Sequence, residues 1–202
     1  HGEDFQAAAE HARRLATGEG MHMIASFARD LVLGVSTYWI EFFEHLKQAG
    51  EVPDVVYVPI GMGSGFAAAA APRAHCGVGT RLVGVVSAHA TAYLDSWRAG
   101  RVVQSPANTW LADGMACRSP DAEALAIVQR EAEDVTAVTD AEAAQAVRAL
   151  YTDTHNLAEG AGAAALAGAW QQRERWKGRA VGITVSGGNV DAPVYAKVLQ
   201  GS

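Results

Sequence analysis

The sequence has few cysteines, no long apolar run and no run of basic residues, and each absence excludes a class of protein. Cys76 and Cys117 are its only cysteines, and they match neither a disulfide framework nor a zinc-site spacing. The longest apolar stretch, residues 31–43, is interrupted by polar residues and by Glu41, so it does not predict a membrane-spanning helix. With 16 basic and 22 acidic side chains, the chain has no charge pattern typical of nucleic-acid or membrane binding, and we expect neither partner.

What the sequence does contain is typical of one globular domain. Half of its 202 residues are hydrophobic, which is enough for a substantial core. Two lone cysteines are typical of reduced thiols, so we expect a cytoplasmic protein. The chain begins at His1 in an acidic segment that has neither an initiating methionine nor the features of a signal peptide, and we expect further sequence upstream.

Short β-branched runs alternate with helical patterns along the chain. Strands are predicted at 21–27, 55–60, 80–86, 135–138 and 181–185, and helices at 4–16, 30–46, 66–74, 121–132, 140–151 and 160–173. Asp30 is the expected N-cap of the second helix. Because buried strands that alternate with helices form sheets covered on both faces, the pattern predicts an α/β fold with a mostly parallel, twisted sheet between helices.

The strongest local motif is Gly61-Met62-Gly63-Ser64-Gly65, which joins a predicted strand to an alanine-rich helix. Alternating glycines let successive backbone N–H groups face one point, and the helix N-terminus adds partial positive charge, so the motif indicates an anion site suited to phosphate. It is no nucleotide motif of the Walker type, because no Gly-Lys-Ser/Thr follows. The dinucleotide pattern GxGxxG also fails, because Phe66 stands where glycine is required.

Three further segments carry polar or small residues at places where ligands bind. Ser186-Gly187-Gly188-Asn189 follows the last predicted strand and offers a hydroxyl and an amide at the carboxyl edge of the sheet. Asp113-Gly114 lies in a loop, and Glu159 precedes the glycine- and alanine-rich start of a helix. Taken singly, these residues also suit ordinary turns and helix entries.

Together, the four segments resemble the pyridoxal phosphate (PLP) enzymes of fold type II, in the group of threonine dehydratases and serine racemases. The resemblance implies that residues 61–65 hold the cofactor phosphate, that Asp113-Gly114 lies near its ring, and that Glu159, which opens a helix, also binds the cofactor. It also implies that Ser186 reaches the pyridine nitrogen from a turn that includes Gly187 and Asn189. Residues 1–28 would be a remnant of the small domain, and residues 29–202 the large PLP-binding domain.

Two departures from this family matter. The family's Schiff-base lysine motif is absent, and Lys47, Lys177 and Lys197 are expected to be exposed surface residues. The resemblance therefore implies a missing N-terminal segment, supplied in cis or in trans, and we expect this chain alone to be inactive. Residues 86–89 (Val-Ser-Ala-His) offer no carboxylate where many relatives bind a divalent cation, so we expect that metal site to be lost. His89 and His155 are expected to be hydrogen-bonded residues near helix ends.

The resemblance implies a PLP-dependent dehydratase that converts L-threonine or a similar 3-hydroxy amino acid to a 2-oxo acid and ammonia by β-elimination. It also implies a homo-oligomer, either a dimer or a tetramer. Alternatives within the family are a serine dehydratase, a dehydratase of hydroxyectoine degradation and a racemase. Because the lysine is absent, a non-catalytic module that binds PLP or another anion is a further alternative.

Overall fold

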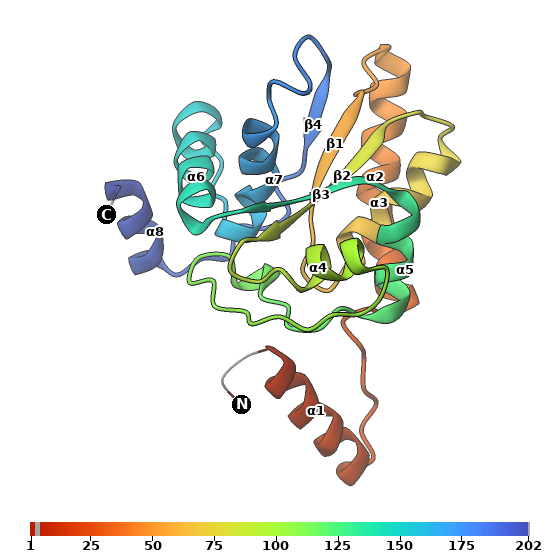
Figure 1. Ribbon diagram of the computed structural model, residues 1–202, viewed down its shortest axis with the longest axis vertical. Coiled ribbons are helices and arrows are strands. Elements are labelled where there is room, and N and C mark those ends of the chain that lie inside the picture. The colour runs from red at the N-terminus through yellow and green to blue at the C-terminus, as the bar shows by residue number, and fades with distance from the viewer. Residues whose placement is uncertain (3–4, 202) are drawn as a thin grey trace.

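The β-branched runs of the sequence form a four-stranded sheet, which lies between two layers of helices in the computed structural model (Figure 1). The structure describes residues 1–2 and 5–201. Its elements are α1 (Phe5–Glu19), α2 (Arg29–Ala49), β1 (Val55–Pro59), α3 (Ser64–His75), β2 (Arg81–Ser87), α4 (Ala92–Ala99), the 3-10 turn η1 (Asp113–Met115), α5 (Ala122–Glu131), β3 (Ala132–Val138), α6 (Asp140–Thr154), α7 (Gly160–Gln171), β4 (Val181–Ile183) and α8 (Ala192–Gln200). The strand order is β3-β2-β1-β4 and every pair is parallel, which confirms the predicted fold class.

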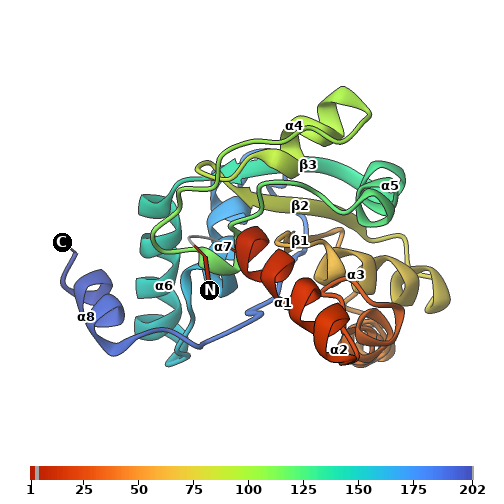
Figure 2. The same ribbon diagram turned by 90° about the horizontal axis from the view of Figure 1, so that it is seen from below.

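Alternate residues of the strands pack against the two helical layers. Val55 and Tyr57 of β1 belong to a core cluster with residues of α6 and α7, whereas Val56 and Val58 belong to one with residues of α2, α3 and α5. All four side chains are buried, as expected for a parallel sheet covered on both faces. Figure 2 shows α6 and α7 on one side of the sheet and α2 and α3 on the other.

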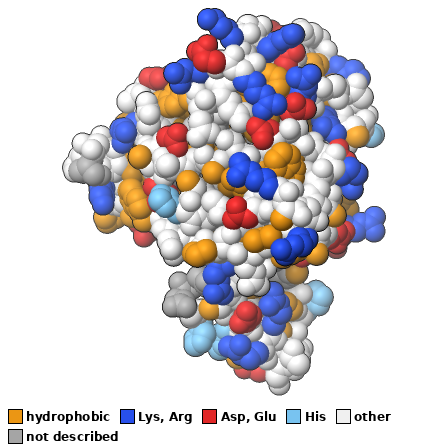
Figure 3. All heavy atoms as spheres, viewed as in Figure 1, with side chains coloured by type: hydrophobic (Ala, Val, Ile, Leu, Met, Phe, Trp, Pro, Cys, Tyr) orange, Lys and Arg blue, Asp and Glu red, His pale blue; other side chains and the backbone are white. Residues whose placement is uncertain are grey.

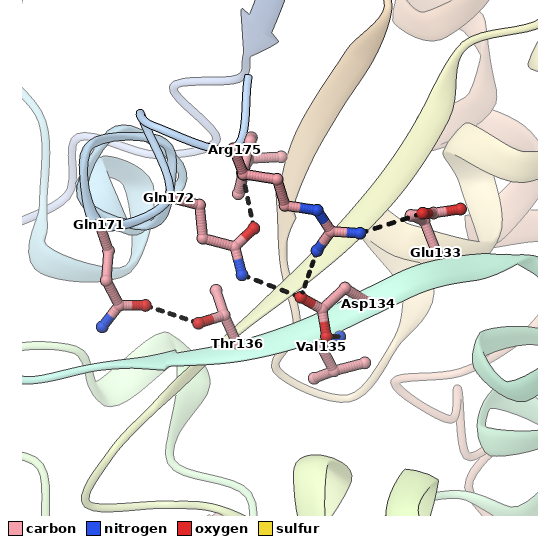
Figure 4. Close-up of polar contacts among 8 residues, drawn as sticks. Glu133, Asp134, Val135, Thr136, Gln171, Gln172 and Arg175 are labelled. Carbon is pink, nitrogen blue, oxygen red and sulfur yellow. Dashed lines mark hydrogen bonds and ion pairs between the residues drawn. The ribbon is translucent and has the colours of Figure 1, made fainter. Parts of the chain in front are cut away.

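A polar network fastens the C-terminal end of α7 to β3 (Figure 4). Gln172 Nε2 and Arg175 Nη1 both donate to Asp134 Oδ2, at 2.9 and 2.8 Å, and Arg175 Nη2 lies 3.0 Å from Glu133 Oε1. Gln171 Oε1 accepts a hydrogen bond from Thr136 Oγ1 at 2.6 Å. These contacts anchor the C-terminal end of α7, opposite its start at Gly160.

The N-terminal region differs from its prediction in two respects. Residues 21–27 form neither strand nor helix but an extended connection from α1 to α2, and Met21 and Ile24 are exposed there. An apolar run of strand length makes no strand where no neighbouring strand pairs with it. Asp30 is not the N-cap of α2: Ala28 holds that position without a side-chain bond, and Asp30 lies in the first turn. Its negative charge is still favourable there, because it lies near the positive end of the helix dipole.

Charges of both signs are mixed on the molecular surface seen in Figure 3. Helix α1 forms a separate lobe below the sheet in that view, beyond the loop of residues 100–120 (Figure 1). The small-domain assignment of residues 1–28 stays a prediction. No helix among the residues that the structure describes is long and apolar enough to cross a membrane.

Candidate functional site

The carboxyl ends of β1 and β4 border a cavity of about 580 Å³. Because parallel strands end at one edge of a sheet, the segments after these two neighbouring strands lie side by side. Of the predicted site residues, Gly61, Met62, Gly63, Ser64, Gly65, Gly114, Glu159 and Ser186 line the cavity. Gly187 and Asn189 do not line it. The four segments that are scattered along the sequence thus meet at one place.

The glycine loop opens α3 with free backbone donors. Gly63 is the N-cap and has a left-handed φ of 94°, which favours glycine. Among the described residues, no group accepts a hydrogen bond from the N–H of Gly63, Ser64 or Gly65. These are the unpaired donors expected at a helix N-terminus, where an anion is stabilised. At Gly61, a Cβ atom would lie 2.2 Å from the Gly114 carbonyl oxygen, so the two loops are in backbone contact.

The loop that carries Gly114 is held by a side chain the sequence analysis did not single out. Asp140, buried at the start of α6, accepts a hydrogen bond from Thr109 Oγ1 at 2.5 Å and one from the N–H of Trp110 at 3.1 Å. Leu111 then packs against the start of α7, where a Cβ atom at Gly160 would lie 2.4 Å from its carbonyl oxygen. Asp140 therefore fixes one wall of the cavity from outside it.

Glu159 joins the start of α7 to the serine turn. Its N–H donates to the carbonyl of Gly187 at 3.1 Å, and a Cβ atom at Gly187 would lie 2.4 Å from its Oε1. Burial raises the pKa of the Glu159 carboxyl group, the negative charge of Asp113 raises it further, and a hydrogen bond from the backbone of Asn189 opposes both. Gly187 and Asn189 thus contact Glu159, which lines the cavity.

Several lining residues had no signal in the sequence. Val35 and Tyr38 come from α2, and Thr184 lies between β4 and Ser186. Burial raises the pKa of the Tyr38 phenol to about 12. Thr184 Oγ1 is buried and finds no hydrogen-bond partner among the described residues. From the sequence alone, such apolar or hydroxyl residues on a helix or strand cannot be distinguished from core residues. Only the fold shows that they line a cavity.

Other candidates lie elsewhere. Lys47, Lys177 and Lys197 are exposed, as predicted, and none lines the cavity. His155 ends α6 in a left-handed conformation with φ 56°, and the N–H of His89, three residues before α4, donates to Ser87 Oγ. Within the described part of the chain, no group of three or more His, Cys, Asp or Glu side chains could hold a metal ion.

Comparison with known proteins shows which proteins this chain is similar to in sequence and in structure. L-threonine ammonia-lyase of Geobacter sulfurreducens is 31% identical over 202 residues, which cover 98% of this chain and 49% of that protein. L-threo-3-hydroxyaspartate ammonia-lyase of Saccharomyces cerevisiae is 27% identical, over 94% of this chain and 57% of that protein. Processed threonine deaminase isoform 2 from Solanum lycopersicum is similar in structure, with a TM-score of 0.88 at 26% identity, over 100% of this chain and 59% of that chain.

The chain spans about half the length of the curated relatives it matches. Its residues 1–187 match the family model for pyridoxal-phosphate dependent enzymes, and this match covers the glycine loop, Gly114, Glu159 and Ser186. The chain therefore belongs to the family of pyridoxal-phosphate dependent enzymes.

Proposed function

We propose that the protein with this chain is a PLP-dependent lyase that removes ammonia from L-threonine or a similar 3-hydroxy amino acid and leaves a 2-oxo acid. The observation that carries the proposal is that the glycine loop after β1 and Ser186 after β4 line the same cavity. Similarity to an L-threonine ammonia-lyase and to an L-threo-3-hydroxyaspartate ammonia-lyase supports the reaction class.

The residues of the cavity fit PLP. Its phosphate needs several donors at one point, and the unpaired N–H groups of Gly63, Ser64 and Gly65 supply them. Its ring needs an apolar wall with a few polar groups, which Val35, Met115 and Ala161 provide together with the hydroxyl of Ser186. The buried, unpartnered Thr184 Oγ1 supplies one more polar atom.

In this proposal the chain contributes binding and orientation, and bound PLP supplies the electron sink for the electrons left behind when an α-proton is removed. Residues 63–65 fix the phosphate end. Ser186 would face the ring nitrogen with a neutral hydroxyl rather than a carboxylate, and so would not favour a protonated nitrogen. Such a hydroxyl would leave the cofactor a weaker electron sink, which would favour prompt loss of the β-hydroxyl group.

Glu159 is placed to hold a proton at its carboxyl group in the cavity wall. Burial and the nearby Asp113 favour its neutral form, and a neutral carboxyl group can donate a hydrogen bond. We propose that Glu159 faces the cofactor ring from the α7 side, while Gly114 keeps backbone close enough to exclude water there.

The lysine that forms the Schiff base is proposed to come from sequence outside this chain, since none of its three lysines lines the cavity. We further propose a homo-oligomer in a reducing compartment. Both cysteines are free and buried, which supports the compartment. The oligomer rests on the family resemblance, and sedimentation velocity would measure it.

The test is a steady-state assay of the full-length protein with PLP. L-threonine, L-serine and L-threo-3-hydroxyaspartate are supplied in turn, and the 2-oxo acid and ammonia are both measured. We expect equal amounts of the two products, with the highest kcat/KM for one of the 3-hydroxy amino acids. Interconversion of enantiomers without ammonia would favour the racemase alternative. Binding of PLP without any turnover would favour the non-catalytic module.

A second experiment tests the assignment of Ser186. Ser186→Asp places a negative charge at the ring nitrogen and so stabilises its protonated form. We expect a lower kcat for elimination and a larger fraction of side reactions per turnover, measured by product analysis. Ser26→Asp, an exposed control in the connection between α1 and α2 and outside this cavity, should leave both unchanged. Unchanged product partitioning in Ser186→Asp would remove Ser186 from this role.

A further inference from the structure

A buried tyrosine beside the glycine loop contacts one of its peptide groups. Tyr93, in α4, is 1% exposed, and its hydroxyl donates to the carbonyl oxygen of Met62 at 2.8 Å. The next residue, Gly63, packs against the same side chain: a Cβ atom there would lie 2.8 Å from Tyr93 Oη and 2.7 Å from Ala124 Cβ. Tyr93 therefore contacts both halves of the Met62–Gly63 peptide unit.

The orientation of this peptide decides where the Gly63 N–H points. In a trans peptide the C=O and N–H bonds point in opposite directions, and the structure has no cis peptide among its described residues. Met62 and Gly63 line the cavity, whereas Tyr93 does not. With the Met62 carbonyl aimed at Tyr93, the Gly63 N–H is turned to the opposite side of the loop, which is the cavity side.

We propose that Tyr93 is a positioning residue for phosphate binding: by holding the Met62 carbonyl, it presents the Gly63 N–H to the cofactor phosphate. The inference rests on the proposed function, because it requires a phosphate group at the glycine loop. It adds a residue of α4 that contacts neither the phosphate nor the cavity.

The chemistry of the site requires tyrosine rather than phenylalanine. Phenylalanine would fill nearly the same space but would leave the Met62 carbonyl without a donor in a buried place, which is unfavourable. Gly63 has no side chain to restrict this peptide, and glycine adopts many conformations, including the left-handed one seen here, at low cost. A hydrogen bond is therefore needed to fix the orientation of the peptide. Burial also raises the pKa of the Tyr93 phenol, so it stays protonated and remains a donor.

The experiment compares two ligands that differ only in the phosphate. Pyridoxine 5′-phosphate and pyridoxine lack the aldehyde and cannot react with a lysine, so calorimetry with the full-length apo-protein measures binding alone. We expect the wild type to prefer the phosphate ester. Tyr93→Phe should weaken binding of pyridoxine 5′-phosphate by about five- to tenfold, the size expected for one lost hydrogen bond, and leave pyridoxine binding unchanged.

Tyr57→Phe is the matched control. Tyr57 is also buried and donates one hydrogen bond, to Gln172 Oε1 at 2.8 Å, but it does not line the cavity. We expect this variant to bind both ligands like the wild type. Equal losses in the two variants, or a Tyr93→Phe variant with wild-type phosphate preference, would overturn the role of Tyr93 and leave the proposed function intact. A wild type with no preference for the phosphate ester would overturn both.

A measurement on the unmodified protein covers the case in which Tyr93→Phe does not fold. Inorganic phosphate is added to ¹⁵N-labelled protein, and the amide resonances of Gly63 and Gly65 are followed. We expect both resonances to move with the same apparent affinity. A Gly65 resonance that moves while that of Gly63 stays fixed would show that the Gly63 N–H does not face the phosphate, and would overturn the inference.

Discussion

The Glu159 carboxyl group couples the stability of the protein to pH. Its pKa in the folded state is raised above the ordinary value of 4.5, mainly by burial. At pH values below 4.5 the carboxyl group holds its proton in both the folded and the unfolded state. As pH rises, the unfolded state loses this proton first. The free energy of unfolding therefore falls as pH rises through the raised pKa. We expect Glu159→Gln to gain stability relative to the wild type between pH 4 and pH 7, measured by urea denaturation.

Asp95 provides a control of opposite sign. Hydrogen bonds from Ser105 Oγ and Thr91 Oγ1 lower its pKa below the ordinary 3.8, so its contribution to stability is present above that value and lost as pH falls. Asp95→Asn should therefore be less stable than the wild type at pH 7, with a difference that shrinks in acid. If the two variants show the same pH trend, the raised pKa of Glu159 is wrong.

Two helical glycines, Gly162 and Gly34, differ in what an added methyl group would meet. At Gly162, in α7, a Cβ atom would lie 2.2 Å from the Gly187 carbonyl oxygen, so Gly162→Ala forces the helix away from the serine turn. We expect a loss of about 1–3 kcal/mol in unfolding free energy and weaker binding of pyridoxine 5′-phosphate. At Gly34, in α2, a Cβ atom would meet nothing within 4 Å beyond its chain neighbours and the helix's own backbone, so Gly34→Ala should gain about 0.5–1 kcal/mol in unfolding free energy. A tolerated Gly162→Ala would contradict the close contact.

Among the elements, α6 holds the loop before η1 through one side chain. Asp140→Ala would leave the Thr109 hydroxyl and the Trp110 N–H without their acceptor, which costs about 1–3 kcal/mol of unfolding free energy. Because the same loop contacts Gly61 and Gly160, we also expect weaker binding of pyridoxine 5′-phosphate. Asp153→Ala, at the exposed far end of α6, should change neither quantity. An Asp140→Ala variant that is destabilised but binds pyridoxine 5′-phosphate normally would show that this loop does not support the binding site.

The success of the sequence predictions differs from element to element for a physical reason. Strands β1 and β2 were predicted well because both are buried on both faces, which leaves near-continuous β-branched runs. The last strand was predicted over 181–185 but ends at Ile183, and the residues that follow it line the cavity. Helices α4 and α8 were not predicted. They are 8 and 9 residues long, too short for a clear periodic pattern.

At the scale of the whole molecule, the sequence could suggest the segments that line the candidate site but not the residues that support it. Glycine loops and serine turns are local motifs with a chemical meaning, and eight of the ten predicted residues line one cavity. Tyr93 and Asp140 act through residues 31 and 30 positions away in the sequence, Met62 and Trp110. Such pairs leave no local pattern, because only the folded sheet brings them together.

Strand β4 forms a weakly protected edge of the sheet. It has three residues and, among the residues that the structure describes, pairs with β1 alone, and Val181 is 41% exposed. An exposed edge is a template for pairing with another strand, and lysine blocks such pairing. We expect Val181→Lys to change the unfolding free energy by less than about 0.5 kcal/mol and to reduce self-association of the 202-residue chain in sedimentation velocity.

Val56 on the neighbouring strand β1 is the control for this edge. It is fully buried, so Val56→Lys places an unpaired charge in the core and should cost about 3 kcal/mol or more. The comparison also reports on what lies beside β4 in the full-length protein. If Val181→Lys is harmless in the 202-residue chain but as damaging as Val56→Lys in the full-length protein, sequence outside this chain covers the edge. Equal damage in both would contradict the exposure of Val181.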